Sequence, residues 1–116
     1  MAGIGLLDER FFLYAEDHDW CMRAGSAGWK VFFLPRAKTI HRKGSSTRQR
    51  RRMARLAFHQ SFVEYYNKHW SKTDSRLKRW LVYLLVYVHG GFDRRIFLPS
   101  DEALQLFQNY PRMAEE

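Results

Sequence analysis

The chain has 116 residues, of which 46% are hydrophobic and 16% aromatic, and its formal net charge is +8. This length allows one hydrophobic core, and the composition excludes an intrinsically disordered chain. The single cysteine excludes an intrachain disulfide and a cysteine-rich zinc module. The longest apolar run, Trp80 to Val88, has nine residues. A helix that spans a membrane needs about twenty.

The charge is unevenly distributed along the chain. Residues 1–34 carry a net charge of −2, residues 35–95 a net charge of +13, and residues 96–116 a net charge of −3. A basic block between mildly acidic ends indicates an anionic partner, which can be a membrane surface or a polyanion such as nucleic acid.

The first part of the chain predicts a helix followed by two short strands. A helix is expected from about Glu16 to Ala27, because its first turn is acidic and Gly28 follows it. The aromatic and β-branched run from Trp29 to Leu34 stops at Pro35, which indicates a strand. A second extended segment is expected from Ala37 to His41.

The spacing of side chains assigns two faces to the first predicted helix. Asp19 and Arg23 are four residues apart, so they are expected to pair on its outer face. Trp20, Ala24 and Ala27 are expected to form the face that packs against the rest of the chain.

The second part of the chain predicts helices. A long basic helix is expected from about Arg48 to His69, with a broad apolar face opposite its arginines. Asp74 or Ser75 is expected to cap a third helix that ends at Gly90. A last short helix is expected between Pro99 and Pro111.

An unusual feature of the sequence is the crowding of Glu16, Asp17 and Asp19 within four positions. Neighbouring carboxylates raise one another's proton affinity, which suits a group that accepts a proton during a reaction. The alternative is a solvated helix start, where acidic side chains complement the helix dipole.

Three motifs follow one another in the first 47 residues. They are LDERFF (Leu7 to Phe12), EDHDWCMR (Glu16 to Arg23), and a tail from Gly28 to Ser45 that contains Pro35 and His41. In this order and spacing they resemble the C-terminal catalytic segment of inverting family-2 glycosyltransferases, especially the rhamnosyltransferase-like branch.

The resemblance implies an α/β fold of the GT-A type, of which this chain holds the C-terminal part. As an isolated chain it is expected to be mostly helical with a few short strands. Residues 1–47 would belong to the catalytic domain, and residues 48–116 would form a basic amphipathic helical tail. The implied function is inverting transfer of a sugar from a nucleotide-sugar donor to a hydroxyl of a glycan or lipid-linked acceptor, in cell-surface polysaccharide or lipid-linked glycan synthesis.

The resemblance also implies roles for the acidic motif. Asp17 would be the general base that takes the proton of the acceptor hydroxyl. Glu16 and Asp19 would support the helix start and orient the acceptor. Trp20 would form an apolar wall of the acceptor site.

The remaining implied roles concern the metal and the substrate. His41 would be a ligand of a divalent metal, Mg²⁺ or Mn²⁺, that neutralises the leaving diphosphate. The alternative for His41 is a packed or surface imidazole. Arg23, Gly44 and Ser45 would bind substrate, with Arg23 also paired to an acidic neighbour.

The donor-binding part of the family pattern is missing from the sequence. No Asp-x-Asp precedes Glu16, although the family places such a motif in a nucleotide-binding half. We therefore expect the chain to be the C-terminal part of an enzyme and to transfer no sugar on its own.

The basic helical half has three interpretations. Basic residues beside the apolar run from Trp80 to Val88 favour an anionic membrane surface, with the protein peripheral on the cytoplasmic face of the cell membrane. A solvated face packed on other parts of the enzyme ranks next, and nucleic-acid binding ranks last. The alternative to an enzyme fragment is a non-catalytic basic module that binds a membrane or nucleic acid.

Overall fold

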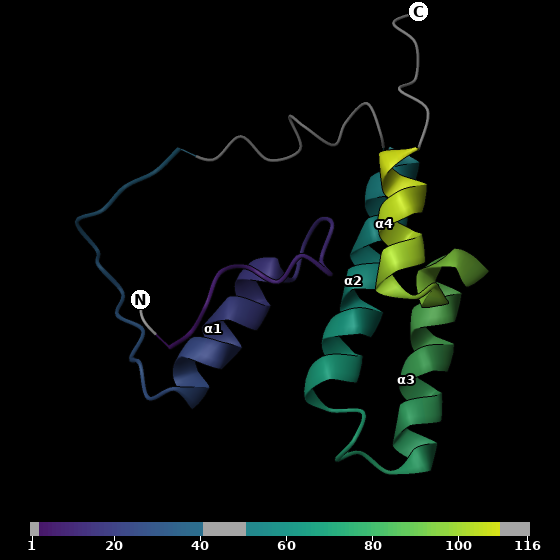
Figure 1. Ribbon diagram of the computed structural model, residues 1–116, viewed down its shortest axis with the longest axis horizontal. Coiled ribbons are helices and arrows are strands. Elements are labelled where there is room, and N and C mark those ends of the chain that lie inside the picture. The colour runs from purple at the N-terminus through teal and green to yellow at the C-terminus, as the bar shows by residue number, and fades with distance from the viewer. Residues whose placement is uncertain (1–2, 41–50, 110–116) are drawn as a thin grey trace, which may run out of the picture.

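The computed structural model describes residues 3–40 and 51–109. Its helices, in chain order, are α1 (Glu16–Ser26), α2 (Arg51–His69), α3 (Arg76–His89), the 3-10 helix η2 (Arg94–Phe97) and α4 (Ser100–Gln108). In Figure 1, α2, α3 and α4 lie together as a small bundle, and α1 lies to one side of α2. The described part of the chain is therefore mostly helical, as expected.

Helix α2 is the centre of the structure, because α3, η2 and α4 all pack against it. The core consists of buried apolar side chains from these four elements: Met53, Leu56, Ala57, Val63, Val86, Ile96, Ala103 and Phe107. The N-terminal segment also packs against this core, since the Phe12 ring stacks on that of Phe107 with centroids 4.8 Å apart. Ser61 Oγ donates to the Leu13 carbonyl at 2.8 Å.

The predicted helices form close to their expected boundaries. Helix α1 begins at Glu16, and α4 begins at Ser100, directly after Pro99. Ser75 caps α3, because its hydroxyl accepts from the Lys78 backbone N–H at 3.3 Å. The predicted first turn of the basic helix, residues 48–50, lies outside the described residues.

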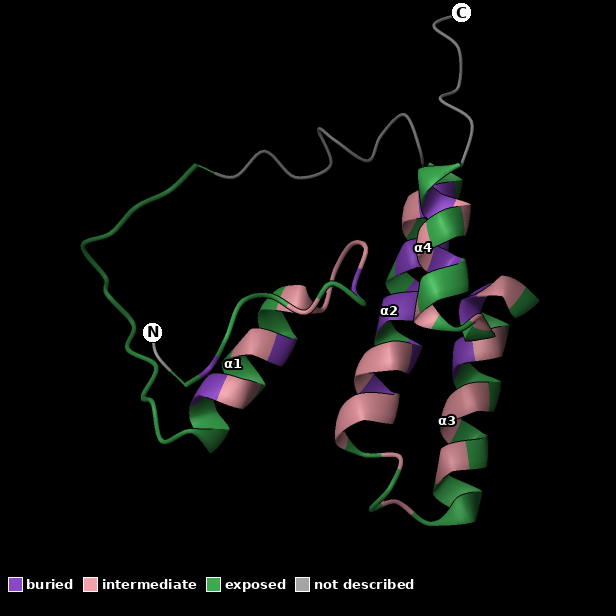
Figure 2. Cartoon of the chain, viewed as in Figure 1, coloured by how far each residue is buried: buried purple, intermediate pink, exposed green. Residues whose placement is uncertain are grey.

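The two predicted strands do not form, so this part of the sequence prediction was wrong. The segment from Trp29 to Leu34 belongs to no sheet, and the Phe33 side chain is 88% exposed. Figure 2 shows this stretch as an exposed green trace after α1. The segment from Ala37 to Ile40 is also outside any sheet. A strand needs a neighbour for its N–H and C=O groups, and residues 3–40 and 51–109 provide none.

The two faces predicted for α1 are partly correct. Ala24 is buried and Trp20 is half-buried, but Ala27 is exposed. Asp19 and Arg23 do pair, yet Asp19 is buried against α2 and does not lie on an outer face. Asp19 faces α2 for an electrostatic reason, because α2 presents the basic side chains of Lys68 and His69 at this position.

Helix α3 leaves an apolar stripe exposed to solvent. Its members recur at helical spacing along the helix: Leu77, Trp80, Leu81, Leu84, Leu85 and Val88. Within the described ranges, no helix has both the length and the apolar character that crossing a bilayer requires. The stripe is an apolar surface that a monomer in water rarely leaves uncovered.

Candidate active site

The turn that precedes α1 has an uncommon backbone conformation. Tyr14 and Ala15 have φ angles of 71° and 65°, in the left-handed region that non-glycine residues rarely adopt. Each such residue costs roughly 1–2 kcal/mol relative to ordinary geometry. The turn places the first residues of α1 opposite α2, so the strain occurs where the acidic motif begins.

This turn and α2 enclose a pocket of about 390 Å³. One side is lined by the five consecutive residues from Tyr14 to His18. The other side is lined by Phe58, Phe62 and Tyr65 of α2, and the Tyr14 and Phe58 rings meet edge to face at 5.7 Å. Flat aromatic walls beside acidic groups suit a ligand with apolar ring faces and hydroxyl groups.

Glu16 and Asp17 supply the carboxylates of this pocket. Glu16 Oε2 is buried and has no hydrogen-bond partner in the described part of the chain. Buried polar atoms are rarely left without a partner, so this oxygen marks a position for a donor from a ligand. Asp17 is exposed, and its Oδ1 accepts from the His18 backbone N–H at 2.8 Å. Glu16 can accept a hydrogen bond from one hydroxyl of a ligand, and Asp17 can accept the proton of another.

Tyr65 adds a hydrogen-bond donor to the aromatic wall. Burial raises the pKa of its hydroxyl above the ordinary value of 10.0, and the negative charge of Asp19 acts in the same direction. The hydroxyl is therefore protonated at neutral pH and can donate to a ligand. Its ring also contacts that of His18, with centroids 6.4 Å apart.

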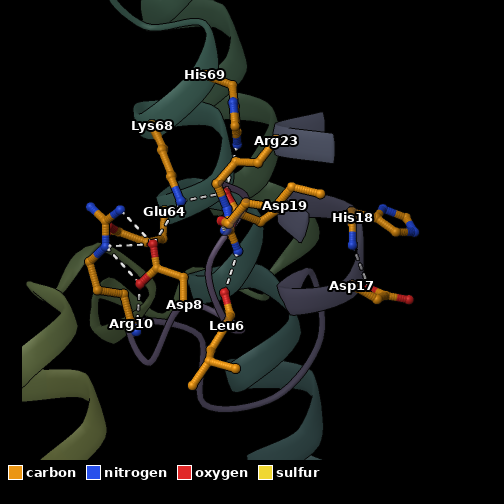
Figure 3. Close-up of polar contacts among 11 residues, drawn as sticks. Leu6, Asp8, Arg10, Asp17, His18, Asp19, Arg23, Glu64, Lys68 and His69 are labelled. Atoms are coloured by element: carbon orange, nitrogen blue, oxygen red, sulfur yellow. Dashed lines mark hydrogen bonds and ion pairs between the residues drawn. The ribbon is translucent and has the colours of Figure 1, made fainter. Parts of the chain in front are cut away.

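Asp19 is fully buried at the centre of a partly exposed ionic cluster. Its Oδ1 accepts from Lys68 Nζ at 2.5 Å and from His69 Nε2 at 2.8 Å. Its Oδ2 accepts from Arg23 Nε at 2.9 Å. Figure 3 shows these three side chains converging on Asp19, while Asp17 points away from them. Burial raises the pKa of Asp19, but the hydrogen bonds from Lys68, His69 and Arg23 outweigh it and lower the pKa below 3.8.

The cluster extends to the N-terminal segment through Asp8. Lys68 Nζ donates to Asp8 Oδ2 at 2.7 Å, and Arg10 binds the same carboxylate, also at 2.7 Å. The hydrogen bond from Arg10 is the main reason that the pKa of Asp8 lies far below its usual range. Arg10 reaches Glu64 at 3.4 Å. We name this set the Asp19 cluster: Asp8, Arg10, Asp19, Arg23, Glu64, Lys68 and His69.

Two other residues with predicted roles face the N-terminal segment. Arg23 Nη2 donates to the Leu6 carbonyl at 2.7 Å and Nη1 donates to the Ile4 carbonyl. Trp20 Nε1 donates to the Gly5 carbonyl at 3.2 Å. Trp20 lines a separate hollow of about 130 Å³, whereas the pocket beside Asp17 has other aromatic walls.

The predicted metal ligand and two predicted substrate contacts, His41, Gly44 and Ser45, lie outside the described residues. Among the residues that the structure does describe, no group of three or more His, Cys, Asp or Glu side chains could hold a metal ion. Asp19 already accepts from three basic side chains. The described donors therefore do not fit a metal centre, and the metal stays a prediction from the resemblance.

The sequence indicated the carboxylates of the pocket but not its aromatic wall. The sequence predicted only a broad apolar face for this helix, and Phe58, Phe62 and Tyr65 belong to that face. Their spacing of three and four residues puts them on one side of α2, but spacing does not show that α1 faces them. The sequence predicted Arg23 as a partner of Asp19 but missed Lys68 and His69 for the same reason, since His69 lies fifty residues away in sequence.

Sequence comparison connects part of the chain to glycosyltransferases. Over 44 residues the chain is 46% identical to an N-acetylglucosaminyl-diphospho-decaprenol L-rhamnosyltransferase of Mycobacterium tuberculosis strain CDC 1551 / Oshkosh, and to the protein of that name from strain H37Rv. The match covers 38% of this chain and 14% of the length of each relative. No protein-family model matches the chain, and no solved structure matches it. The similarity supports a relationship to glycosyltransferases.

Proposed function

We propose that this chain is the acceptor-side part of an inverting glycosyltransferase of family 2 with a GT-A fold. The complete enzyme would transfer a sugar from a nucleotide-sugar donor to a hydroxyl of a lipid-linked glycan. The relatives' name, which contains a diphospho-decaprenol, suggests an isoprenoid acceptor. The observation that carries the proposal is the pocket in which Glu16 Oε2 lacks a partner among the described residues and Asp17 is exposed beside it.

The reaction requires that one bond forms as another breaks. The acceptor oxygen forms a bond to the anomeric carbon, and the bond from that carbon to the nucleotide diphosphate breaks with its electron pair leaving on the diphosphate. The acceptor hydroxyl gives its proton to Asp17, which acts as the general base. Glu16 accepts a hydrogen bond from the acceptor, and the aromatic wall holds the acceptor in place.

The aromatic wall provides a test of acceptor binding. Replacing Phe62 by alanine in the complete enzyme should raise the KM for a polyprenyl-diphosphate-linked acceptor about tenfold, because it removes apolar area from the wall. The KM for the nucleotide sugar should not change. Initial rates of sugar transfer, measured with each substrate varied in turn, give both constants.

A matched control is Phe97→Ala. Phe97 is exposed to a similar extent, 39% against 42% for Phe62, and does not line the pocket. This control should leave both KM values unchanged. Absence of sugar transfer to the acceptor, or equal effects of the two substitutions, would contradict the proposed function.

We further propose that α3 binds the surface of an anionic membrane at the cytoplasmic face. The exposed apolar stripe of α3 adjoins basic side chains of the same helix, such as Arg76 and Lys78. Apolar side chains that enter the interface and cations that meet lipid phosphates bind such surfaces together. The acceptor proposed above would be anchored in the same membrane.

Sedimentation with vesicles tests this membrane contact. The chain should sediment with vesicles that contain anionic lipid and much less with purely zwitterionic vesicles, and salt should weaken the binding. Replacing Trp80 by serine should reduce the bound fraction, because Trp80 is 58% exposed on the stripe. Tight binding of duplex DNA without vesicle binding would favour a nucleic-acid module instead.

A further inference from the structure

An apolar groove lies on the surface between α2 and α3, on the side of the pocket. It has a volume of about 440 Å³. Its walls include Phe58 and Phe62 from α2, and Val82, Leu85 and Val86 from α3. The volume and the apolar lining are typical of a site for a small apolar ligand.

The groove lies next to the pocket that holds Glu16 and Asp17. Phe58 and Phe62 line both spaces, so the two hollows share a wall. The pocket is acidic and aromatic, whereas the groove is mainly apolar, with His59 and His89 in its lining. A ligand that occupies both has a polar, hydroxyl-bearing head and a long apolar chain.

Basic side chains of α2 lie at the groove and close to it. Arg55 is exposed and lies three residues before Phe58, so both share a side of α2. Its guanidinium lies beside Gly91, just beyond the end of α3, and lines neither the groove nor the pocket. His59 in the groove wall donates from Nδ1 to the Arg55 carbonyl at 2.7 Å, which fixes the orientation of the imidazole.

We propose that the groove between α2 and α3 binds the isoprenoid chain of a lipid-linked acceptor, with the sugar in the pocket beside Asp17. This rests on the proposed glycosyl transfer. The groove lies at the side of a helix whose exposed stripe is the proposed membrane contact, so the isoprenoid can enter from the bilayer. Recognition then involves the lipid as well as the sugar.

The groove makes a binding prediction that needs no catalysis. The 116-residue chain, without vesicles, should bind geranylgeranyl diphosphate much more tightly than inorganic diphosphate. Replacing Leu85 by glutamine should weaken this binding about tenfold, since it removes an apolar contact with the ligand. Isothermal titration calorimetry measures both affinities, and circular dichroism verifies that the variant folds.

Leu77→Gln is the matched control. Leu77 is on the same helix and is equally exposed, 67% for each, but does not line the groove. It should bind the probe as the unmodified chain does. Equal weakening by both substitutions would indicate adsorption on the α3 stripe, and equal binding of inorganic diphosphate would indicate a phosphate site. Either result, or absence of binding, would contradict the proposal that the groove binds the isoprenoid chain.

Failure of this proposal can be separated from failure of the proposed function. Asp17→Asn should leave geranylgeranyl diphosphate binding unchanged, because Asp17 is in the pocket and not in the groove. If that variant of the complete enzyme still transfers sugar while the probe binds as expected, Asp17 is not the general base, but the proposed isoprenoid site in the groove is supported. If transfer depends on Asp17 but the probe does not bind, the proposed isoprenoid site is wrong and the proposed function is not affected.

Discussion

Replacing Asp19 by asparagine should lower the free energy of unfolding by about 3–5 kcal/mol. Asp19 is fully buried and accepts from Lys68, His69 and Arg23. Asparagine has nearly the same shape but no charge, so the substitution deprives the partly buried side chains of Lys68, His69 and Arg23 of the negative charge of Asp19. A loss of this size is a large fraction of the stability of a small domain.

Denaturation by urea, followed by circular dichroism, measures the effect. Asp101→Asn is the control, because Asp101 is an exposed carboxylate in the first turn of α4 and the chemical change is identical. It should change the stability by less than about 0.5 kcal/mol. If Asp19→Asn were as mild as the control, the Asp19 cluster would contribute nothing to the fold.

The same carboxylate gives the unfolding free energy a defined pH dependence. The pKa of Asp19 is lower in the folded chain than its ordinary value of 3.8. A lowered pKa contributes stability that is present above the unfolded value and is lost as the pH falls through the folded value. The chain should therefore become less stable as the pH drops below about 4. Asp19→Asn should reduce this slope, leaving the part due to Asp8, Asp74 and Asp93, whose pKa values are also lowered.

A double-mutant cycle tests whether Lys68 is the partner that matters. Lys68→Met removes the cation that bridges Asp8 and Asp19. The double variant should be less destabilised than the sum of the single variants, by roughly 1–3 kcal/mol, because residues in one ionic network do not act independently. Additive effects would show that Lys68 and Asp19 are not coupled.

Replacing Asp17 by asparagine in the complete enzyme should slow sugar transfer by about 10²–10⁴-fold, the range for loss of a general base. The amide that replaces the carboxylate cannot take the proton of the acceptor hydroxyl, although it occupies almost the same volume. Affinity for the nucleotide-sugar donor should remain close to that of the unmodified enzyme. Transfer rates and donor binding measured on the same preparation separate catalysis from binding.

Folding is not expected to confuse this result, because Asp17 is exposed and its described side-chain contact is to a neighbouring backbone N–H. Asp101→Asn serves again as the control, since it removes an exposed helix-start carboxylate outside the pocket. It should leave the transfer rate unchanged. A rate for Asp17→Asn within a few-fold of that of the unmodified enzyme would remove Asp17 from its role as the base.

The sequence alone predicted the four α-helices that the structure describes in residues 3–40 and 51–109, although not the 3-10 helix η2. The signals were local: the acidic first turn at Glu16, the cap at Ser75 and the turn at Pro99 are each set by neighbours within a few residues. The sequence also singled out the three carboxylates Glu16, Asp17 and Asp19. The strand predicted from Trp29 to Leu34 failed, because the local pattern was correct for a strand but a sheet requires a partner.

Only the tertiary structure decided which of three neighbouring carboxylates is available for chemistry. Glu16, Asp17 and Asp19 look alike in the sequence, but α1 turns Asp19 toward Lys68 and His69 and leaves the other two at the aromatic pocket. The left-handed turn at Tyr14 and Ala15 sets this orientation. Pairing over fifty residues depends on how helices pack, and packing depends on the whole core, whereas helix formation depends on neighbours.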